Sequence, residues 1–314
     1  MANDIEATGP GRPLISVIVP TRDRPRALTH CLASLAAQTV IDRLEVIVVD
    51  DGSLGAAKIA SIAASSGRTR LIRRDGGGPA AARNAGAREA RGSFLCFTDD
   101  DCAPLADWAE RLAGALEDGA DAAAGVTLSG GGALADASEL IAHAPAGLSS
   151  EGGGDLPFAP TNNIACTRNV FQAIQFDESF PGPAGEDRDW CARLALAGYA
   201  LRSEPRACVV HHQVLTFGGF LRQQFGYGQG AYRFRRRSGE LRRFEPPSFY
   251  AALVRRGFSQ SLGVGLLVAG AQLATAAGFA FAWAAQRKTS RSVTVASSAS
   301  TTGADESPGR SERP

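Results

Sequence analysis

The sequence predicts an α/β fold in which helices flank a mostly parallel sheet. Between residues 13 and about 215, short apolar segments alternate with segments of helical periodicity, which is the pattern of repeated strand–helix–strand units. The apolar segments are continuous rather than alternating, as expected for strands that are covered on both faces. Of the 314 residues, 44% are hydrophobic, so the chain can bury a sizeable core and complete intrinsic disorder is excluded.

The first half of this region repeats the unit most clearly. Residues 14–20 (LISVIVP) are a continuous apolar strand, and residues 25–38 carry apolar side chains at helical spacing behind Pro25. The same pattern predicts further strands at 44–50, 69–74 and 93–99, and further helices at 56–65 and 79–90.

The second half is less regular. It contains predicted strands at 121–129 and 206–212, a strand running into a helix within 158–174, and a helix at 186–199. The Gly- and Ala-rich residues 130–155 between them are expected to form loops and a short helix.

These patterns divide the chain into a main domain and a C-terminal region. The main domain covers residues 13–215, in two halves at 13–102 and 103–215. The other segments are a flexible arm (1–12), an Arg-rich helical region (216–256), a candidate transmembrane helix (257–286) and a disordered tail (287–314).

Composition argues against several classes of protein. Because 33 Lys and Arg balance 32 Asp and Glu, a globally basic protein that binds nucleic acid is not expected. The six Cys include no C-x-x-C pair, which argues against a zinc ribbon and a small disulfide-rich domain. The first twelve residues are polar and lack the apolar segment of a signal peptide, so a reducing, cytosolic setting is expected for the main domain.

The candidate transmembrane helix contains no charged residue. It is longer than the roughly 20 apolar residues that cross a bilayer. Because it includes Gln272 and Thr275, a buried core helix or an interfacial helix is the alternative. Nine Arg lie between 219 and 256, on its N-terminal side, where they favour a cytosolic main domain and attract anionic membrane lipid.

Three acidic clusters follow predicted strands. They are Asp23 after the first strand, Asp50 and Asp51 after the second, and the run 99–101 after the fourth. One such cluster alone is most often a turn or a helix cap. Three of them at the carboxyl edge of one parallel sheet, where ligands bind, point to a bound cation or donor groups. Asp99 and Asp101 can point the same way from an extended chain and offer the oxygen ligands that Mg²⁺ or Mn²⁺ prefers.

Two further motifs have open interpretations. Glu186 and Asp187 open a helix after a Gly- and Pro-rich loop, either as acids that favour the helix N-terminus or as a general base in a cleft. His211 and His212 end a strand, and one of them is either a core histidine or a metal ligand. The Gly-rich residues 76–86 match neither the phosphate-loop nor the dinucleotide-binding pattern.

Four segments together resemble the inverting family 2 glycosyltransferases. They are SVIVPTRDR (16–24), EVIVVDDGS (45–53), GPAAARNAGAREARGSFLCFTDDDC (78–102) and GEDRDWCARLALAGY (185–199), whose order and spacing match over about 15–215. The resemblance implies a GT-A fold. Residues 220–237, followed by an apolar segment, are similar to the membrane-associated members. The Gln-x-x-Arg-Trp motif of processive synthases is absent, which favours a non-processive enzyme.

The resemblance also implies roles for individual residues. Asp187 corresponds to the catalytic base, with Glu186 beside it to orient the acceptor or the base. Asp99 and Asp101 correspond to the DXD motif, which with His211 would hold a divalent metal, Mg²⁺ or Mn²⁺. The donor nucleotide would be bound by Pro20, Thr21, Arg22, Asp23, Asp50, Asp51, Arg83 and Asp100. Residues 13–102 would then be the nucleotide-binding half and 103–215 the acceptor half.

The implied function is transfer of a sugar from a nucleotide-diphosphate donor to a hydroxyl of a saccharide or lipid-linked acceptor, in cell-envelope polysaccharide synthesis. The enzyme would lie at the cytoplasmic membrane with its catalytic domain in the cytosol. Two alternatives stay open at this point: a sugar-nucleotidyltransferase, and an inactive scaffold that binds a nucleotide sugar. The first needs a Gly-rich loop with a basic residue after the first strand, where this chain has Pro-Thr-Arg-Asp.

Overall fold

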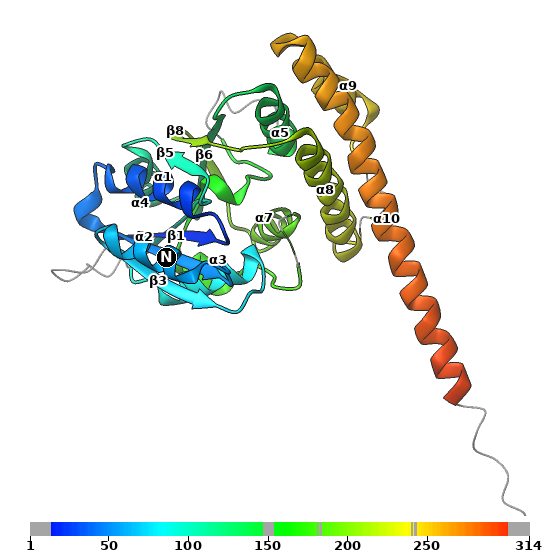
Figure 1. Ribbon diagram of the computed structural model, residues 1–314, viewed down its shortest axis with the longest axis horizontal. Helices are drawn as coiled ribbons and strands as arrows, with labels where there is room; N and C mark the ends of the chain where they lie inside the picture. Colours follow the sequence, from blue (N-terminus) through cyan, green and yellow to red (C-terminus); the bar gives the residue numbers. More distant parts are fainter. Residues whose placement is uncertain are drawn as a thin grey trace, which may run out of the picture.

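One eight-stranded sheet organises the part of the chain that the structure describes, residues 14–146, 154–180, 182, 184–239, 241 and 244–300. In the computed structural model, helices cover both faces of the sheet and a further group of helices lies at its side (Figure 1). The strands are β1 (Ile15–Thr21), β2 (Leu44–Asp51), β3 (Thr69–Arg74), β4 (Phe94–Phe97), β5 (Cys102–Pro104), β6 (Ala122–Ser129), β7 (Ile164–Thr167) and β8 (Leu201–His211). The helices are α1 (Pro25–Ala36), α2 (Ala56–Ser65), α3 (Pro79–Glu89), α4 (Trp108–Glu117), α5 (Ala133–His143), α6 (Arg168–Ala173), α7 (Glu186–Leu196), α8 (Phe217–Arg237), α9 (Pro247–Gln260) and α10 (Leu262–Ser300).

The sheet is parallel in its first half and mixed in its second. Its strand order is β3-β2-β1-β4-β7-β6-β8-β5. The strands β1 to β4 pair in parallel, whereas β7 is antiparallel to both β4 and β6, and β5 is antiparallel to β8. The predicted α/β fold with a mostly parallel sheet is confirmed. The strands β1, β2 and β4 therefore end at the same edge of the sheet.

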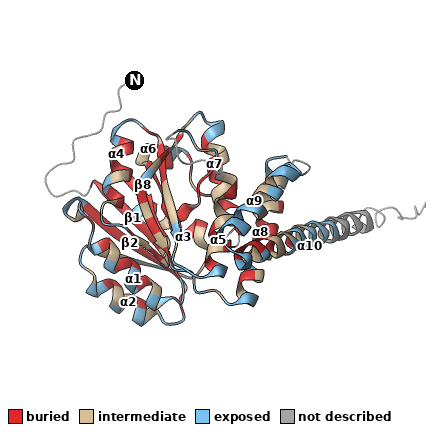
Figure 2. Cartoon of the chain, turned by 90° about the horizontal axis from the view of Figure 1, so that it is seen from above, coloured by how far each residue is buried: buried red, intermediate tan, exposed pale blue. Residues whose placement is uncertain are grey.

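Alternate residues of the central strands face two apolar layers, so the sheet is buried on both sides (Figure 2). Val17 and Val19 of β1 pack in the layer that contains α1 and α4, whereas Ile18 packs in the layer that contains α3 and α7. All three side chains are fully buried. Burial on both faces is the reason why these strands have continuous apolar sequences.

A close approach of α3 to the sheet fixes the position of the site residue Arg83. A Cβ at Gly86 would lie 2.6 Å from the Cγ2 of Ile18 and 3.0 Å from that of Val49. Since a larger side chain would push α3 outward, glycine here lets the helix lie directly on β1 and β2. Arg83 is one turn earlier on the same helix.

Several elements differ from the sequence analysis. The strand β5 and the helix α4 were not predicted, and β8 begins at Leu201 rather than at residue 206. Within residues 130–155 the expected short helix is confirmed as α5, of three turns. The strand β8 alternates buried residues with partly or fully exposed ones, and its pairing to β6 contains a bulge. Because its first half lacks a continuous apolar sequence, the sequence predicted only the second half of the strand.

The helices α8, α9 and α10 form a layer of their own against α5. Phe220, Leu253, Val264 and Val268 make the core of this layer. The helices α8 and α10 touch through glycine, because a Cβ at Gly228 would lie 1.9 Å from the backbone oxygen of Thr275. Small residues at such a contact are typical of helices that associate in membranes. We call α8 to α10 the C-terminal helical layer.

The C-terminal boundaries need two corrections. The expected apolar helix at 257–286 is divided, because residues 257–260 end α9 and the extended backbone of Ser261 separates it from α10. The expected tail does not begin at 287, because α10 continues to Ser300 through a stretch without Gly or Pro. The arm 1–12 and residues 301–314 of the tail lie outside the described residues.

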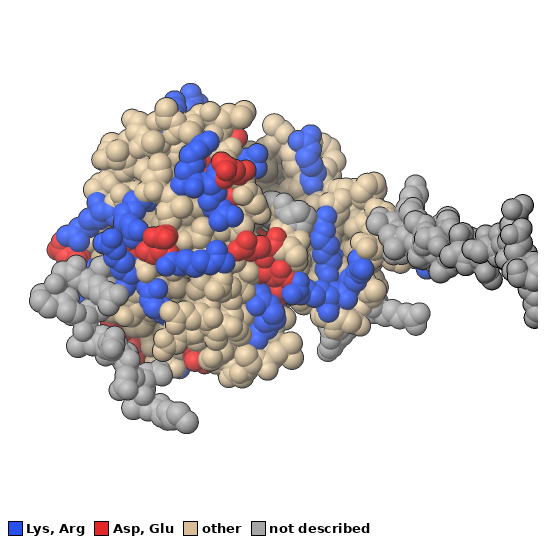
Figure 3. Space-filling model, turned by 90° about the horizontal axis from the view of Figure 1, so that it is seen from below, with Lys and Arg blue, Asp and Glu red and all other residues tan. Residues whose placement is uncertain are grey.

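One helix in the described part of the chain is long and apolar enough to cross a membrane, at Leu262–Arg287. Its first half packs into the C-terminal helical layer through Val264, Val268 and Ala271. On the opposite face Leu262, Leu266 and Leu273 are exposed. On the molecular face drawn in Figure 3, basic side chains occur on both the sheet domain and this layer, with acidic side chains gathered between them.

Candidate active site

A cavity of about 710 Å³ lies at the carboxyl ends of β1, β2 and β4, between the sheet and the helices α5, α7 and α8. Its lining comes from segments far apart in the sequence. This agrees with the prediction that acidic residues after neighbouring parallel strands lie at one edge of the sheet. Twelve of the thirteen residues assigned to the site from the sequence line it: Pro20, Thr21, Arg22, Asp23, Asp51, Arg83, Asp99, Asp100, Asp101, Glu186, Asp187 and His211.

Asp50 is the residue that does not line the cavity. Its carboxylate accepts a hydrogen bond from the Ser53 backbone N–H (2.9 Å) and is paired with Arg73 (2.5 Å), so it shapes the turn after β2. Asp51 lines the cavity instead, and one of its oxygens accepts from the Gly78 N–H (2.8 Å). The other oxygen, Oδ1, is buried and forms an ion pair with the Arg74 Nε (3.6 Å), but it accepts no hydrogen bond from the described residues. Asp51, rather than Asp50, therefore has an acceptor available for a ligand.

Asp100 joins the loops after β1 and β4. Its carboxylate accepts hydrogen bonds from the Thr21 hydroxyl (2.6 Å) and from the Arg24 guanidinium (3.1 Å). Burial raises the pKa of Asp100 to about 6, although Arg24 and Thr21 oppose this shift. Arg24 also binds Asp101 (2.7 Å) and was not found by the sequence analysis. The middle residue of the acidic run thus holds the two loops together.

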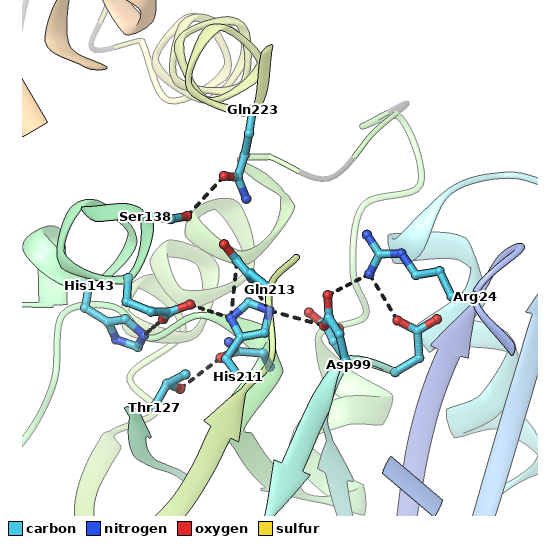
Figure 4. Close-up of polar contacts among 12 residues, drawn as sticks. Arg24, Asp99, Thr127, Ser138, His143, His211, Gln213 and Gln223 are labelled. Carbon is cyan, nitrogen blue, oxygen red and sulfur yellow. Dashed lines mark hydrogen bonds and ion pairs between the residues drawn. The ribbon is translucent and has the colours of Figure 1, made fainter. Parts of the chain in front are cut away.

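Asp101 and His211 meet at the strand ends. Figure 4 shows the His211 ring among the polar side chains gathered there. The His211 Nε2 lies 3.1 Å from Asp101 Oδ1, and its Nδ1 makes a short hydrogen bond with Glu139 of α5. Burial lowers the pKa of His211, but the two carboxylates outweigh it and raise that pKa to about 10. Burial raises the pKa of Asp101, but His211 and Arg24 bring it below its usual value. His212, by contrast, is exposed and does not line the cavity.

Arg83 spans the cavity wall from β4 to α7. Its guanidinium binds Asp99 Oδ1 (2.7 Å) and Glu186 Oε1 (3.2 Å), and its own side chain is only 4% exposed. Burial lowers the pKa of Arg83, but Asp99 and Glu186 more than compensate and raise it. The Nε of Arg83 has no hydrogen-bond partner among the described residues. Asp99, after β4, and Glu186, in the first turn of α7, are therefore tied together by one buried cation.

Glu186 and Asp187 differ in their contacts. Burial raises the pKa of Glu186 to about 7, with Asp187 adding to the shift and Arg83 opposing it. Burial also raises the pKa of Asp187, whose Oδ1 accepts a hydrogen bond from the Arg188 backbone N–H (2.8 Å). Glu186 is engaged with Arg83, whereas no ion pair to Asp187 occurs in the described part of the chain. Asp187 is therefore the carboxylate better placed to act on a ligand.

The turn before α7 brings these acids against α8. Gly185 has a φ of +96°, and a Cβ there would lie 2.9 Å from the Gly230 backbone oxygen. Both features require glycine, because a side chain would meet the backbone of α8. The glycine of the Gly-Glu-Asp sequence is thus required by the packing of this turn against α8.

The donor atoms at the strand ends fit a hard divalent cation in part. Among the described residues, one group of metal-binding side chains lies within 4.8 Å of one another: Asp101, Cys102 and His211. Burial raises the pKa of the Cys102 thiol well above its usual range, and its side chain lies in the apolar layer, so sulfur is not a suitable ligand. An oxygen and an imidazole nitrogen remain, as protein ligands for Mn²⁺ or Mg²⁺. Asp99 is outside this group because Arg83 holds its carboxylate.

Several lining residues could not be found from the sequence. Glu139 lies on α5, in a stretch without a readable motif, and approaches His211 across 72 residues of chain. The C-terminal helical layer forms another wall of the cavity. Among the lining residues of this layer and of α7 are Arg188, Gln223, Tyr227, Arg235, Tyr250, Leu253, Gln272 and Thr275.

A family model and curated relatives agree on one kind of protein. Residues 16–173 match the model "Glycosyl transferase family 2". The chain is 29% identical over 231 residues to glycosyltransferase AglE of Haloferax volcanii, covering 69% of this chain and 73% of that protein. It is 29% identical over 238 residues to the pre-mycofactocin glycosyltransferase of Mycobacterium tuberculosis, covering 71% of this chain. The chain spans about half (48%) of the length of this second relative.

A solved structure shares the fold. It is the mannosyltransferase PcManGT from Pyrobaculum calidifontis in complex with GDP-Man and Mn²⁺, with a TM-score of 0.55. The alignment covers 92% of this chain and 80% of that one, at 19% sequence identity. At this identity the likeness concerns the fold, and it confirms the GT-A architecture.

Proposed function

This chain belongs to glycosyl transferase family 2 and is therefore a glycosyltransferase that uses a nucleotide sugar. We propose that the transfer inverts the configuration at the anomeric carbon of the sugar and that Asp187 is the catalytic base. The observation that carries this proposal is the bridge made by Arg83. It ties Asp99, at the end of β4, to Glu186, which adjoins Asp187 in the same cavity. The donor-binding edge of the sheet and the proposed base thus face one space.

The donor half of the proposal uses polar atoms that make no hydrogen bond among the described residues. Asp51 Oδ1 is a buried acceptor that suits an N–H or hydroxyl of the base or ribose, and Arg83 Nε is a buried donor that suits the diphosphate. Thr21 and Arg22 line the same side of the cavity. One of these atoms is a hydrogen-bond acceptor and the other is a hydrogen-bond donor. Together they favour a ligand that carries both hydrogen-bond donors and acceptors, as a nucleotide does.

The chemical step needs a single displacement. The acceptor hydroxyl oxygen forms a bond to the anomeric carbon from the face opposite the diphosphate, whose oxygen leaves with the bonding electron pair. The hydroxyl proton passes to the Asp187 carboxylate. Burial raises the pKa of Asp187, which makes it a better proton acceptor than an exposed aspartate. Glu186 holds Arg83 in place and thereby orients the wall beside the base.

We propose that Asp101 and His211 hold the divalent metal, with Asp99 next to them. A bound Mn²⁺ or Mg²⁺ would supply positive charge to the donor diphosphate. Glu139 would keep the His211 ring oriented through its Nδ1. Asp101→Ala is expected to abolish the metal dependence of donor binding, and a donor affinity that still rises with Mn²⁺ would contradict this assignment.

The acceptor is proposed to be a saccharide or a lipid-linked saccharide at the membrane. The support is the exposed apolar face of α10, made by Leu262, Leu266 and Leu273, beside the Arg-rich helix α8. Such a face with flanking arginines favours contact with anionic lipid, with the sheet domain on the cytosolic side. Flotation of the full chain with liposomes tests it, and a chain that stays unbound in low salt would contradict it.

The base assignment is tested with Asp187→Asn in the full chain. We expect release of nucleoside diphosphate from the sugar donor to fall at least about 100-fold, because general-base catalysis typically contributes that much. Donor binding, measured by calorimetry with GDP-mannose first and UDP, dTDP and CDP sugars after it, should stay within a few fold.

The matched control is Asp189→Asn on the same helix, which lies outside the cavity lining and should keep its turnover. Loss of donor binding in folded Asp187→Asn, or full turnover by it, would remove Asp187 from this role. Binding of a nucleotide sugar by the wild-type chain without turnover on any acceptor would favour the inactive scaffold. The sugar-nucleotidyltransferase alternative is set aside because the family match is to glycosyltransferases.

A further inference from the structure

One part of the cavity lining is not used by the donor, the metal or the base. Two arginines, Arg188 of α7 and Arg235 of α8, line it together with Phe158, Tyr250 and Leu253. Removing a charged guanidinium from water is costly, so an arginine that lines a cavity is usually paired with a carboxylate, stacked on an aromatic ring or bound to an anion. This part of the lining is next to Asp187 in the sequence and in the cavity.

Arg188 ends on an aromatic ring rather than on a carboxylate. Its guanidinium lies 5.5 Å from the ring centroid of Phe158, and the ion pairs found in the part of the chain that the structure describes do not include Arg188. The neighbouring carboxylate of Asp187 accepts a hydrogen bond from the backbone N–H of Arg188. The hydrogen-bond donors of the guanidinium are therefore not committed to an ion pair.

Arg235 approaches the same space from α8. Its guanidinium stacks over the rings of Phe244 (4.9 Å) and Phe279 (5.8 Å), which fixes its direction. Burial lowers the pKa of Arg188, and Arg235 lowers it further, while Asp187, Glu245 and Tyr250 oppose this. The two cations are thus close enough to interact electrostatically, and the carboxylates of Asp187 and Glu245 also lie within reach of Arg188.

We propose that Arg188 and Arg235 form a phosphate subsite for the acceptor, which places an acceptor hydroxyl beside Asp187. Two guanidinium groups suit a phosphate because each can donate two hydrogen bonds to its oxygens. The proposal rests on the proposed function, whose acceptor it makes more specific.

The lining around the two arginines favours a lipid phosphate as the source. It continues to Leu253 of α9 and to Gln272 and Thr275 of α10. The opposite side of α10 carries the exposed leucines of the proposed membrane face. A carrier lipid held at that face could place its phosphate in the subsite. A soluble sugar phosphate has the same recognised group, so the experiment includes both.

The test is calorimetric titration of the full chain in detergent micelles. Saturating nucleoside diphosphate and Mn²⁺ fill the donor site, so that added phosphate compounds report on the second subsite. The titrants are farnesyl phosphate, uncharged farnesol and glucose 1-phosphate. The variants are Arg188→Gln and Arg235→Gln. The matched control is Arg236→Gln, an exposed neighbour that is outside the cavity lining.

We expect farnesyl phosphate to bind at least about tenfold more tightly than farnesol, and each cavity variant to lose about tenfold, as for a charge-assisted hydrogen bond. Arg236→Gln should stay within about twofold, since an exposed charge contributes little. Glucose 1-phosphate binding as tightly as farnesyl phosphate, with the same arginine dependence, would support the subsite and assign a soluble source.

Two results would overturn the subsite. One is equal affinity for farnesyl phosphate and farnesol, and the other is a loss in Arg236→Gln as large as in the cavity variants. Unchanged nucleoside diphosphate affinity shows that each variant is folded. If the wild-type chain binds no nucleotide, the proposed function fails, while the same titration without nucleotide still decides the subsite.

Discussion

Replacing Glu186 by Gln should remove a large part of the pH dependence of stability between about pH 4.5 and 7. Glu186 is buried, its Oε1 binds Arg83, and its Oε2 has no hydrogen-bond partner among the described residues. Burial raises its pKa from 4.5 to about 7. The folded chain therefore holds this proton more tightly than the unfolded chain. The stabilisation is fully present below pH 4.5 and is lost as the pH rises through 7.

The size of the effect follows from the same pKa values. A difference of about 2.5 in pKa, at about 1.4 kcal/mol for each unit, gives about 3 kcal/mol in the free energy of unfolding. This is an upper limit, because the neighbouring Asp187 carries part of the shift. In Glu186→Gln the side chain has no proton to lose, and the pKa of Asp187 should fall because its negative neighbour is gone.

Guanidinium denaturation of the full chain in mild detergent at pH 5 to 8 measures the difference. The wild type should lose about 2–3 kcal/mol more than Glu186→Gln over this range. Asp100, whose pKa is also raised, to about 6, titrates in both proteins and cancels in the comparison. Glu117→Gln, at an exposed surface pair with Arg43, is the control and should follow the wild type. Parallel curves for the wild type and Glu186→Gln would refute the reasoning.

Three further substitutions probe the metal, the donor and the helical layer. Glu139→Gln should weaken Mn²⁺ binding about 10- to 100-fold, because the His211 ring loses its charged partner; calorimetry with Mn²⁺ alone measures it, and unchanged affinity would show that Glu139 does not act on the metal. Asp51→Asn should weaken nucleoside diphosphate binding in the same calorimeter, and an affinity equal to the wild type would exclude Asp51 from the donor site. Gly228→Val should lower the melting temperature by several degrees, because the new Cβ would lie 1.9 Å from the Thr275 oxygen; a melting temperature equal to the wild type would contradict the close packing of α8 on α10.

The proposed donor side of the cavity could be predicted because local sequence determines it. A continuous apolar run followed by an acid defines both a strand and the edge at which it ends, and parallel strands bring those ends together. Asp51, Asp99 and Asp101 were found in this way. Asp50 was assigned with them because adjacent residues at a strand end look alike in sequence. Only the structure shows that its carboxylate is used by Ser53 and Arg73.

The rest of the cavity lining could not be predicted because distant contacts determine it. Glu139 meets His211 only after α5 packs beside the end of β8, and no spacing in the sequence relates the two. The same holds for Arg235, which reaches the cavity because Gly185 and Gly228 allow α7 and α10 to lie close to α8. Helix periodicity indicates which residues face a neighbour, but it does not indicate which neighbour that is.

A substitution at the strand ends should therefore have a different effect from a substitution in the C-terminal helical layer. The donor residues stand on strand ends that are buried on both faces, so a shift in any of them disturbs the sheet core. The residues of the C-terminal helical layer stand on helices that meet the sheet domain mainly through α5 and α7. A change at Arg188, Arg235 or Tyr250 can alter acceptor binding while the bridge from Asp99 through Arg83 to Glu186 keeps its geometry. For this reason acceptor variants should change acceptor affinity without changing donor affinity, whereas variants of the Arg83 bridge should change both.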